Sequence, residues 1–173
     1  MSSLNIRPAS VAEFAVAADW AASEGWNPGL DDLSAFHAAD NEGFLMGFID
    51  QKPVTSISVV RYGSGFGFLG FYITHPDHRG HGHGFATWEA GLTHLNGRTI
   101  GLDGVVEQQN NYRKSGFALT GRNVRYSGVV GPLEARFGAS EIRRFRPSDW
   151  NALATYDRPF FADDRGVFLR QWV

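Results

Sequence analysis

Residues 66–95 read FGFLGFYITHPDHRGHGHGFATWEAGLTHL, and this stretch decides the fold that the sequence predicts. Residues 66–73, rich in aromatic residues, have the composition of a strand, and Pro76 breaks the run that follows them. Apolar side chains then recur at helical spacing, which predicts a helix over residues 82–96. The expected buried stripe of this helix consists of Phe85, Trp88, Leu92 and Leu95. A glycine-rich turn therefore joins a strand to the N-terminus of a helix.

The turn, residues 79–84, reads RGHGHG and is suited to binding phosphate groups. A helix N-terminus leaves about four backbone N–H groups unpaired and carries a partial positive charge. Glycines at this place let an anion approach the backbone closely. A P-loop is excluded because no lysine follows Gly84, and a dinucleotide fingerprint is excluded because Thr87 stands where its third glycine would be. The sequence thus predicts a phosphate-containing ligand of another kind.

Two motifs resemble those of the GNAT acetyltransferase superfamily. Residues 79–84 match the Arg/Gln-x-x-Gly-x-Gly/Ala loop that binds the pyrophosphate of acyl-CoA in that family. Residues 112–117, YRKSGF, are similar to the block that closes the last helix of the family's core. The segments WAASEGWNPG at 20–29 and GLDG at 101–104 resemble the N-terminal domain of bacterial tandem-GNAT proteins. The resemblance covers roughly residues 4–130 and implies acetyl-CoA as the co-substrate.

The other patterns agree with the element order βααβββαβαββ of the GNAT fold, an α/β (α+β) architecture built on a mixed sheet. Ser10 and Glu13 predict a capping box, and the helix that follows is expected to bury Val11, Phe14, Ala18 and Ala21. The expected strands are residues 4–7, 43–49, 54–61, 66–73, 99–103, 117–120 and 122–130. The expected helices begin at residue 10 and at residue 31 or 32, and cover residues 82–96 and 107–115.

Composition excludes several classes of protein. The chain has 173 residues, 43% of them hydrophobic, which is enough for one domain with a sizeable core. Its net charge of −2 provides no positive field, so we expect neither nucleic acid nor a membrane surface as a partner. The absence of cysteine excludes disulfides, thiolate metal sites and a cysteine nucleophile. No apolar run approaches the roughly 20 residues of a membrane span and no signal peptide is recognisable, so we expect a soluble cytoplasmic protein.

We expect three segments along the chain. Residues 1–130 form the GNAT acetyltransferase domain, and residues 131–140 form a linker. Residues 141–173 resemble the start of a second, incomplete GNAT-like repeat, since EIRRFRPSDW at 141–150 is similar to the opening NIRPAS. A segment of about 40 residues cannot bury a core of its own. We therefore expect it to dock on the first domain or on a partner subunit, the latter giving a homodimer.

The expected acetyl-CoA site combines the turn with the strand before it. Backbone N–H groups of residues 79–84 are expected to hold the pyrophosphate, helped by the Arg79 side chain. Gly67 and Gly70 inside the strand indicate a bulge, a close ligand approach or tight packing. The resemblance implies that the strand opens there to admit the pantetheine arm. The residues expected to contact acetyl-CoA are Phe71, Tyr72, Ile73, Arg79, Gly80, His81, Gly82, His83, Gly84 and Asn111.

The resemblance also implies a proton donor. Tyr112 occupies the position of the tyrosine that protonates the departing thiolate. A phenol, whose ordinary pKa is near ~10, is a neutral donor at neutral pH. The family usually has an asparagine seven residues earlier, where this chain has Val105, and Asn111 is among the nearby side chains expected to replace it.

The sequence leaves more than one candidate for the group that accepts the proton of the amine. Without cysteine no acyl-cysteine intermediate can form, so direct attack of the amine on the thioester is expected. Asp103 and Glu24 are the two candidate general bases, and a water relay is the alternative to both. In relatives the segment that joins the first two helices shapes the acceptor side, which implies that Trp26 and Asn27 contact the amine.

The expected function is therefore transfer of an acetyl group from acetyl-CoA to a primary amine of a small molecule or a protein. One alternative is a non-catalytic module that binds acyl-CoA or regulates another protein. A further alternative is a metal-binding interaction domain built on His75, His78, His81 and His83. Alternating histidines need not converge on one point, however, and we expect no metal.

Overall fold

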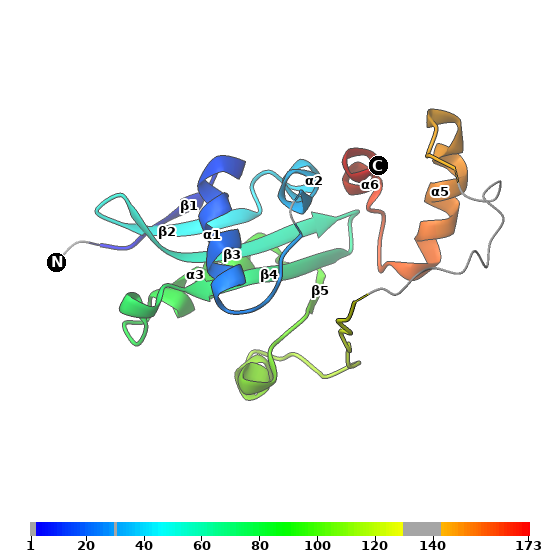
Figure 1. The fold of residues 1–173 in the computed structure, drawn as a ribbon. Helices are drawn as coiled ribbons and strands as arrows, with labels where there is room; N and C mark the ends of the chain where they lie inside the picture. Colours follow the sequence, from blue (N-terminus) through cyan, green and yellow to red (C-terminus); the bar gives the residue numbers. More distant parts are fainter. Residues whose placement is uncertain (1–2, 30, 130–142) are drawn as a thin grey trace. The chain divides into compact units, whose positions relative to one another are not determined.

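The computed structural model describes residues 3–29, 31–129 and 143–173 (Figure 1). It divides into two compact units. The first unit comprises the residues up to Asp103 together with those from Ala152 onward, and the second runs from Gly104 to Asn151. The expected linker at 131–140 lies outside the described residues.

A five-stranded mixed sheet forms the centre of the first unit. Its strands are β1 (Asn5–Pro8), β2 (Phe44–Ile49), β3 (Lys52–Tyr62), β4 (Phe66–Thr74) and β5 (Thr99–Leu102), and they lie in this order across the sheet. Neighbouring strands are antiparallel from β1 to β4, whereas β4 and β5 are parallel. The predicted meander of strands is thus confirmed, and the parallel pair is possible because a helix connects β4 to β5.

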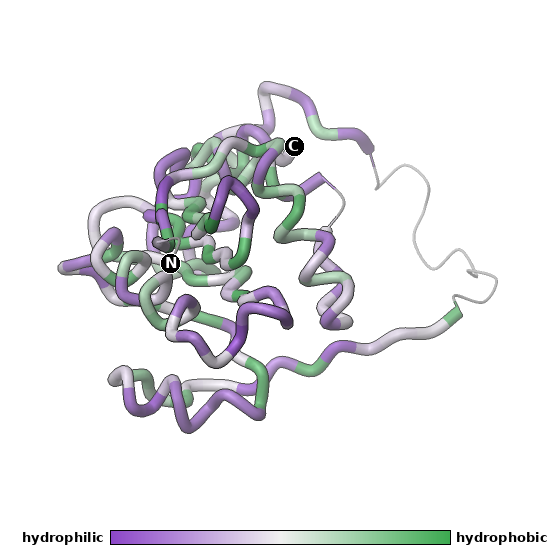
Figure 2. The backbone as a smooth tube through the Cα atoms, turned by 90° about the vertical axis from the view of Figure 1, so that its left-hand side faces the viewer, coloured by the Kyte–Doolittle hydropathy of each residue, from purple (hydrophilic) through white to green (hydrophobic). Residues whose placement is uncertain are grey.

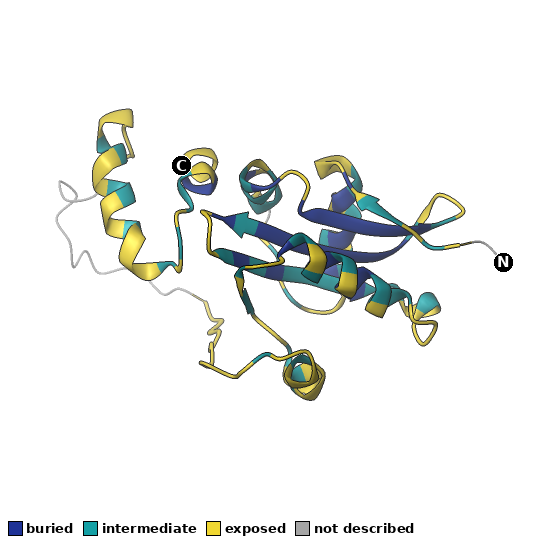
Figure 3. Ribbon diagram, turned by 180° about the vertical axis from the view of Figure 1, so that it is seen from behind, coloured by how far each residue is buried: buried dark blue, intermediate teal, exposed yellow. Residues whose placement is uncertain are grey.

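Helices cover both faces of this sheet (Figure 1). The helices α1 (Val11–Ser23) and α2 (Asp32–Ala39) lie on one face, where the Phe44 ring contacts Phe14 from α1 and His37 from α2. The other face carries α3 (His83–His94). A Cβ atom on Gly91 would lie 3.0 Å from side-chain atoms of Ile57 and Val59, so this glycine lets α3 approach β3 closely. Figure 3 shows the result of this packing, in which largely buried strands lie between helices whose outer faces are exposed.

The helix boundaries follow from local signals, but two buried stripes differ from the prediction. The capping box is confirmed, since the Ser10 hydroxyl accepts from the Glu13 N–H and the Glu13 carboxylate accepts from the Ser10 N–H. Val11 and Phe85 are wrong as buried positions, because 37% and 62% of their surfaces are exposed. Ala17 and Thr87 are buried on the corresponding helices instead. Residues three and four apart share a helix face, so an apolar residue at the stripe's edge can point to solvent.

The second unit departs from the prediction after its helix. It contains a short 3₁₀ turn (Val106–Gln108) followed by α4 (Gln109–Lys114). The strands expected at 117–120 and 122–130 are wrong for the described residues, because residues 117–129 form no strand. Their side chains are largely exposed, Tyr126 to 90%, so this segment buries little apolar surface and pairs with no strand in the described part of the chain. The order βααβββαβα is confirmed, and the closing ββ is not.

The C-terminal segment of the first unit packs on α2. It contains the end of α5 (Trp150–Asp157), a 3₁₀ turn (Arg158–Phe160) and α6 (Gly166–Trp172). The rings of Phe36 and Phe168 lie 4.8 Å apart, and Trp172 Nε1 donates to Asp32 Oδ1 at 3.1 Å. Figure 1 shows α6 beside α2. Whether residues 141–173 begin a second repeat stays a prediction.

The helices alternate between hydrophilic and hydrophobic residues along their length (Figure 2). Among the described residues, no helix combines the length and the apolar character that crossing a bilayer requires.

Candidate functional site

A β-bulge interrupts β4 near its end. Ser56 on β3 pairs with Ile73, whereas Ser58, two residues further along, pairs with Gly70. Ile57 therefore lies opposite both Phe71 and Tyr72, so β4 contains one extra residue here. Phe71 adopts a φ of +46°, in the left-handed region that bulky side chains rarely enter. The bulge that the glycines of this strand predicted is thus present.

Glycine is needed at the two positions of β4 for different reasons. A Cβ atom on Gly67 would lie 2.6 Å from Leu95 Cδ2, so Gly67 makes room for the packing of α3. Gly70 lies next to the bulge, and a Cβ atom there would be 3.1 Å from Ser58 Oγ. Only Gly70 therefore belongs to the candidate site.

Past the bulge, β4 extends beyond its parallel neighbour (Figure 1). The pairing of β4 with β5 ends at Leu69 and Leu102, while β4 continues to Thr74. The predicted base Asp103 follows the last residue of β5 and is exposed. The bulged backbone of β4 and the carboxylate after β5 thus border the place where the two strands stop pairing.

The glycine-rich turn forms an open cradle before α3. Gly80 and Gly82 have φ values of +80° and +82°, which glycine adopts without steric cost. Gly82 is the N-cap of α3, and no side chain caps the helix there. A Cβ atom on Gly80 or Gly82 would meet no atom within 4 Å, whereas one on Gly84 would lie 2.5 Å from Thr74 Oγ1. Gly84 therefore seats α3 against β4, and the other two glycines leave the uncapped helix end open to an anion.

Arg79 links this turn to the end of α1. Its Nε donates to the Thr74 carbonyl at 2.9 Å, and its Nη2 contacts Glu24 Oε1 at 2.5 Å. From the sequence, Arg79 and Glu24 are both expected in the site, but in separate roles. In the structure Glu24 holds the arginine that begins the turn.

The two acceptor-side candidates follow Glu24 directly. Trp26 is half-buried and its backbone N–H donates to the Ala21 carbonyl at 2.9 Å. Asn27 is exposed and adopts a φ of +49°, as asparagine does more readily than most residues. Both belong to the first unit, in the connection between α1 and α2.

The histidines around the turn form a row rather than a metal site. Ring centroids lie 6.0 Å apart for His75 and His78, and 6.4 Å apart for His78 and His83. His81 stacks on His83 at 5.8 Å. The buried His75 Nδ1 has no hydrogen-bond partner and lies 3.8 Å from Asp77 Oδ2. Across the described residues, no three His, Cys, Asp or Glu side chains are arranged to hold a metal ion.

The predicted donor and its neighbour belong to the second unit. Tyr112 lies on α4, and its burial raises the pKa of its phenol above the ordinary value. The phenol therefore stays protonated at neutral pH, as a proton donor requires. Asn111 Nδ2 donates to Gln108 Oε1 at 2.7 Å.

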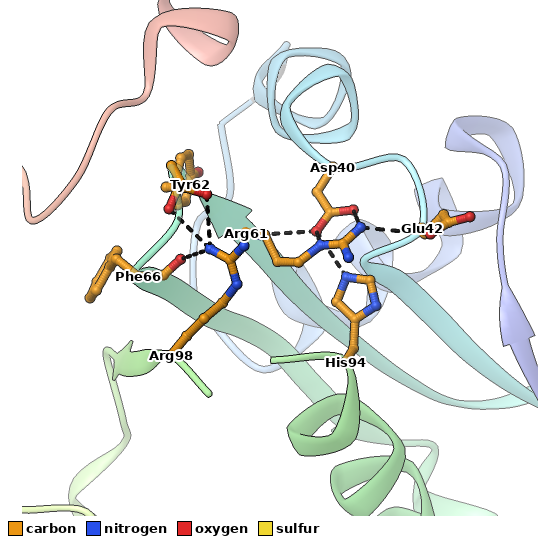
Figure 4. Close-up of polar contacts among 8 residues, drawn as sticks. Asp40, Glu42, Arg61, Tyr62, Phe66, His94 and Arg98 are labelled. Atoms are coloured by element: carbon orange, nitrogen blue, oxygen red, sulfur yellow. Dashed lines mark hydrogen bonds and ion pairs between the residues drawn. The ribbon is translucent and has the colours of Figure 1, made fainter. Parts of the chain in front are cut away.

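A polar cluster that the sequence analysis missed lies toward the other end of β3 (Figure 4). Asp40 follows α2, and its carboxylate accepts from the Arg61 N–H at 3.0 Å, Nε at 2.7 Å and Nη2 at 3.0 Å. His94 Nε2 lies 2.8 Å from the same carboxylate. Burial raises the pKa of Asp40, but the hydrogen bonds from Arg61 and His94 outweigh it and hold that pKa below its ordinary value. The cluster fastens the end of α2 to β3 and to the last turn of α3.

Comparison with known proteins gives the family. The model of the acetyltransferase (GNAT) family matches residues 12–117. A holothin acyltransferase from Pseudoalteromonas sp. (strain SANK 73390) is 32% identical over 167 residues, which are 96% of this chain and 56% of that protein. This chain thus spans about half the length of that relative.

Solved structures share the fold at low sequence identity. A candidate acetyltransferase from Pyrococcus horikoshii superposes with a TM-score of 0.68 at 16% identity, over 99% of this chain and 62% of that one. A predicted acetyltransferase from Clostridium acetobutylicum, solved with acetyl-CoA, gives a TM-score of 0.56 at 16% identity, over 72% and 96% of the two chains. Because the family model covers more than half of the chain, this protein belongs to the acetyltransferase (GNAT) family.

Proposed function

We propose that this protein binds acetyl-CoA and transfers its acetyl group to an amine. The observation that carries the proposal is the uncapped N-terminus of α3, with Gly80 and Gly82 leaving open space around it. Backbone N–H groups of residues 79–84 would hold the pyrophosphate, and the bulged backbone of residues 71–73 would line the pantetheine arm. The family membership supports this proposal, as does the similar fold of a protein solved with acetyl-CoA.

The chain's own residues would handle the two protons of the reaction. The amine nitrogen attacks the thioester carbonyl carbon, the C–S bond breaks and the thiolate takes up a proton. We assign that proton to Tyr112, whose raised pKa keeps the phenol neutral. For the proton lost by the amine we favour Asp103 over Glu24, because Asp103 directly follows β5 at the place where β4 and β5 stop pairing. Asn111 would assist in binding acetyl-CoA.

Trp26 and Asn27 would shape the acceptor side. The name of the Pseudoalteromonas relative makes holothin the first acceptor to test. Location in the cytoplasm and the absence of nucleic-acid and membrane partners stay predictions from the sequence, as does pairing into a homodimer.

The test is a thiol-release assay with acetyl-CoA and a panel of amines that begins with holothin. We expect acceptor-dependent release of CoA thiol by the wild-type protein and turnover at least about 100-fold lower in Tyr112→Phe, with CoA affinity unchanged. Equal turnover in both proteins would remove the donor role from Tyr112. CoA binding without turnover on any amine would favour the alternative, a non-catalytic acyl-CoA-binding module.

A further inference from the structure

Ser56 makes the side-chain hydrogen bond that holds the bulge of β4. Its Oγ donates to the Phe71 carbonyl at 2.8 Å, and Ser56 has no exposed surface. The bond joins β3 to the one residue of β4 that has a positive φ. A fully buried serine hydroxyl needs a hydrogen-bond partner, and this carbonyl supplies it.

The Phe71 conformation requires such support. A phenylalanine at a φ of +46° is strained, and strained backbone persists only where its surroundings hold it. On the α1 side, the Phe14 ring packs edge-on against the Phe71 ring with centroids 5.6 Å apart. The ring contact restrains the side chain, whereas the Ser56 bond restrains the peptide group itself.

The orientation of the peptide group after Phe71 decides which backbone group the bulge presents to a ligand. In a trans peptide the C=O and the N–H point in opposite directions. The Phe71 carbonyl points to Ser56 on β3, so the N–H of the same peptide, which belongs to Tyr72, points away from β3. That direction is toward the edge of β4 that extends beyond the last β5 pair, Leu69 and Leu102.

We propose that Ser56 is a positioning residue that sets the bulge for the pantetheine arm of acyl-CoA. It does not touch the ligand and acts only through the Phe71 carbonyl. This inference rests on the proposed function, because it needs acyl-CoA to lie along β4. Ser56 should therefore matter for the pantetheine arm and not for the pyrophosphate, which is held by the turn before α3.

Two ligands distinguish binding of the pantetheine arm from binding of the phosphates. CoA carries both the arm and the phosphates, whereas adenosine 3′-phosphate 5′-diphosphate carries only the phosphates. Ser58→Ala is the matched control, since Ser58 is a buried serine on the same strand and face and its hydroxyl makes no hydrogen bond to the described residues. Ser56→Cys is the second variant, because it keeps the shape of the side chain, with a somewhat larger sulfur in place of oxygen, and weakens the donor.

The experiment is calorimetric titration of both ligands into wild-type protein and the three variants, with melting temperatures as a folding check. We expect Ser56→Ala and Ser56→Cys to weaken CoA about tenfold, as loss of one hydrogen bond implies. Their affinity for adenosine 3′-phosphate 5′-diphosphate should stay within about twofold of wild type, and Ser58→Ala should alter neither ligand.

Three outcomes would overturn the inference or its basis. Unchanged CoA affinity in Ser56→Ala and Ser56→Cys would show that the bulge does not need this bond. An equal loss for both ligands would mean that Ser56 supports the whole fold rather than the arm site. A wild-type protein that binds neither ligand would instead refute the proposed function, and the inference would fall with it.

Discussion

Replacing Asp40 with asparagine should lower the free energy of unfolding by about 3 kcal/mol, at the low end of the range for breaking a buried ion pair. The carboxylate is 2% exposed and accepts three hydrogen bonds from Arg61, with His94 also in contact. Asparagine would set its own N–H₂ group against these donors. The Arg61 side chain is 38% exposed, so water can take over part of its solvation and limit the loss.

The assay is equilibrium unfolding in urea together with the melting temperature. For a chain of this length, about 3 kcal/mol corresponds to a fall of roughly 6–12 °C in melting temperature. Glu42→Gln is the control, because Glu42 lies 3.6 Å from the same arginine but is 69% exposed. Its unfolding should be indistinguishable from wild type. An Asp40→Asn variant as stable as Glu42→Gln would refute the account of this cluster.

Three further results should follow. The folded-state pKa of Asp40 is lowered, so its contribution to stability is present above the ordinary aspartate pKa of about 4 and is lost as pH falls below it. The gap in melting temperature between wild type and Asp40→Asn should therefore shrink between about pH 6 and pH 3, and a constant gap would contradict this. Gly67→Ala should cost about 1–3 kcal/mol of stability, seen in urea unfolding, because its Cβ would press on Leu95; CoA affinity should not change, and lost affinity in a stable variant would make Gly67 a ligand contact. Phe168→Ala should cost about 3–5 kcal/mol by the same measurement, since Phe168 is buried against Phe36, and a neutral result would mean that α6 does not stabilise the first unit.

Features set by neighbouring residues could be predicted from the sequence. Ser10 and Glu13 are three residues apart, and their capping box formed as expected. The strand over 66–73, the turn and the helix after it were predicted together, because an aromatic-rich run ends at Pro76 and apolar residues at helical spacing follow the glycines. The bulge next to Gly70 was also foreseen, since glycine inside a strand weakens the regular ladder.

Features that depend on distant residues could not be predicted. The contact of Arg79 with Glu24 spans 55 residues, and Asp40 meets His94 across 54. Sequence neighbours indicate neither pairing, because a contact between residues so far apart depends on the tertiary fold. Ser56 is one of several polar residues on β3, and its partner in the bulge depends on the register of β3 and β4. The strands expected after residue 116 failed because β composition does not supply a neighbouring strand.

The most direct test of the central claim is calorimetric titration of acetyl-CoA into wild type, Gly82→Asp and Gly97→Asp. Gly82 and Gly97 lie at opposite ends of α3, with φ values of +82° and +80°, and a Cβ atom on either would meet nothing within 4 Å. Aspartate is among the residues that tolerate this conformation, so the folds should survive, while a carboxylate at residue 82 would repel the pyrophosphate. We predict micromolar binding by wild type and Gly97→Asp, and a loss of at least about tenfold in Gly82→Asp. No binding by wild type, or equal binding by all three proteins, would contradict an acyl-CoA site at this turn.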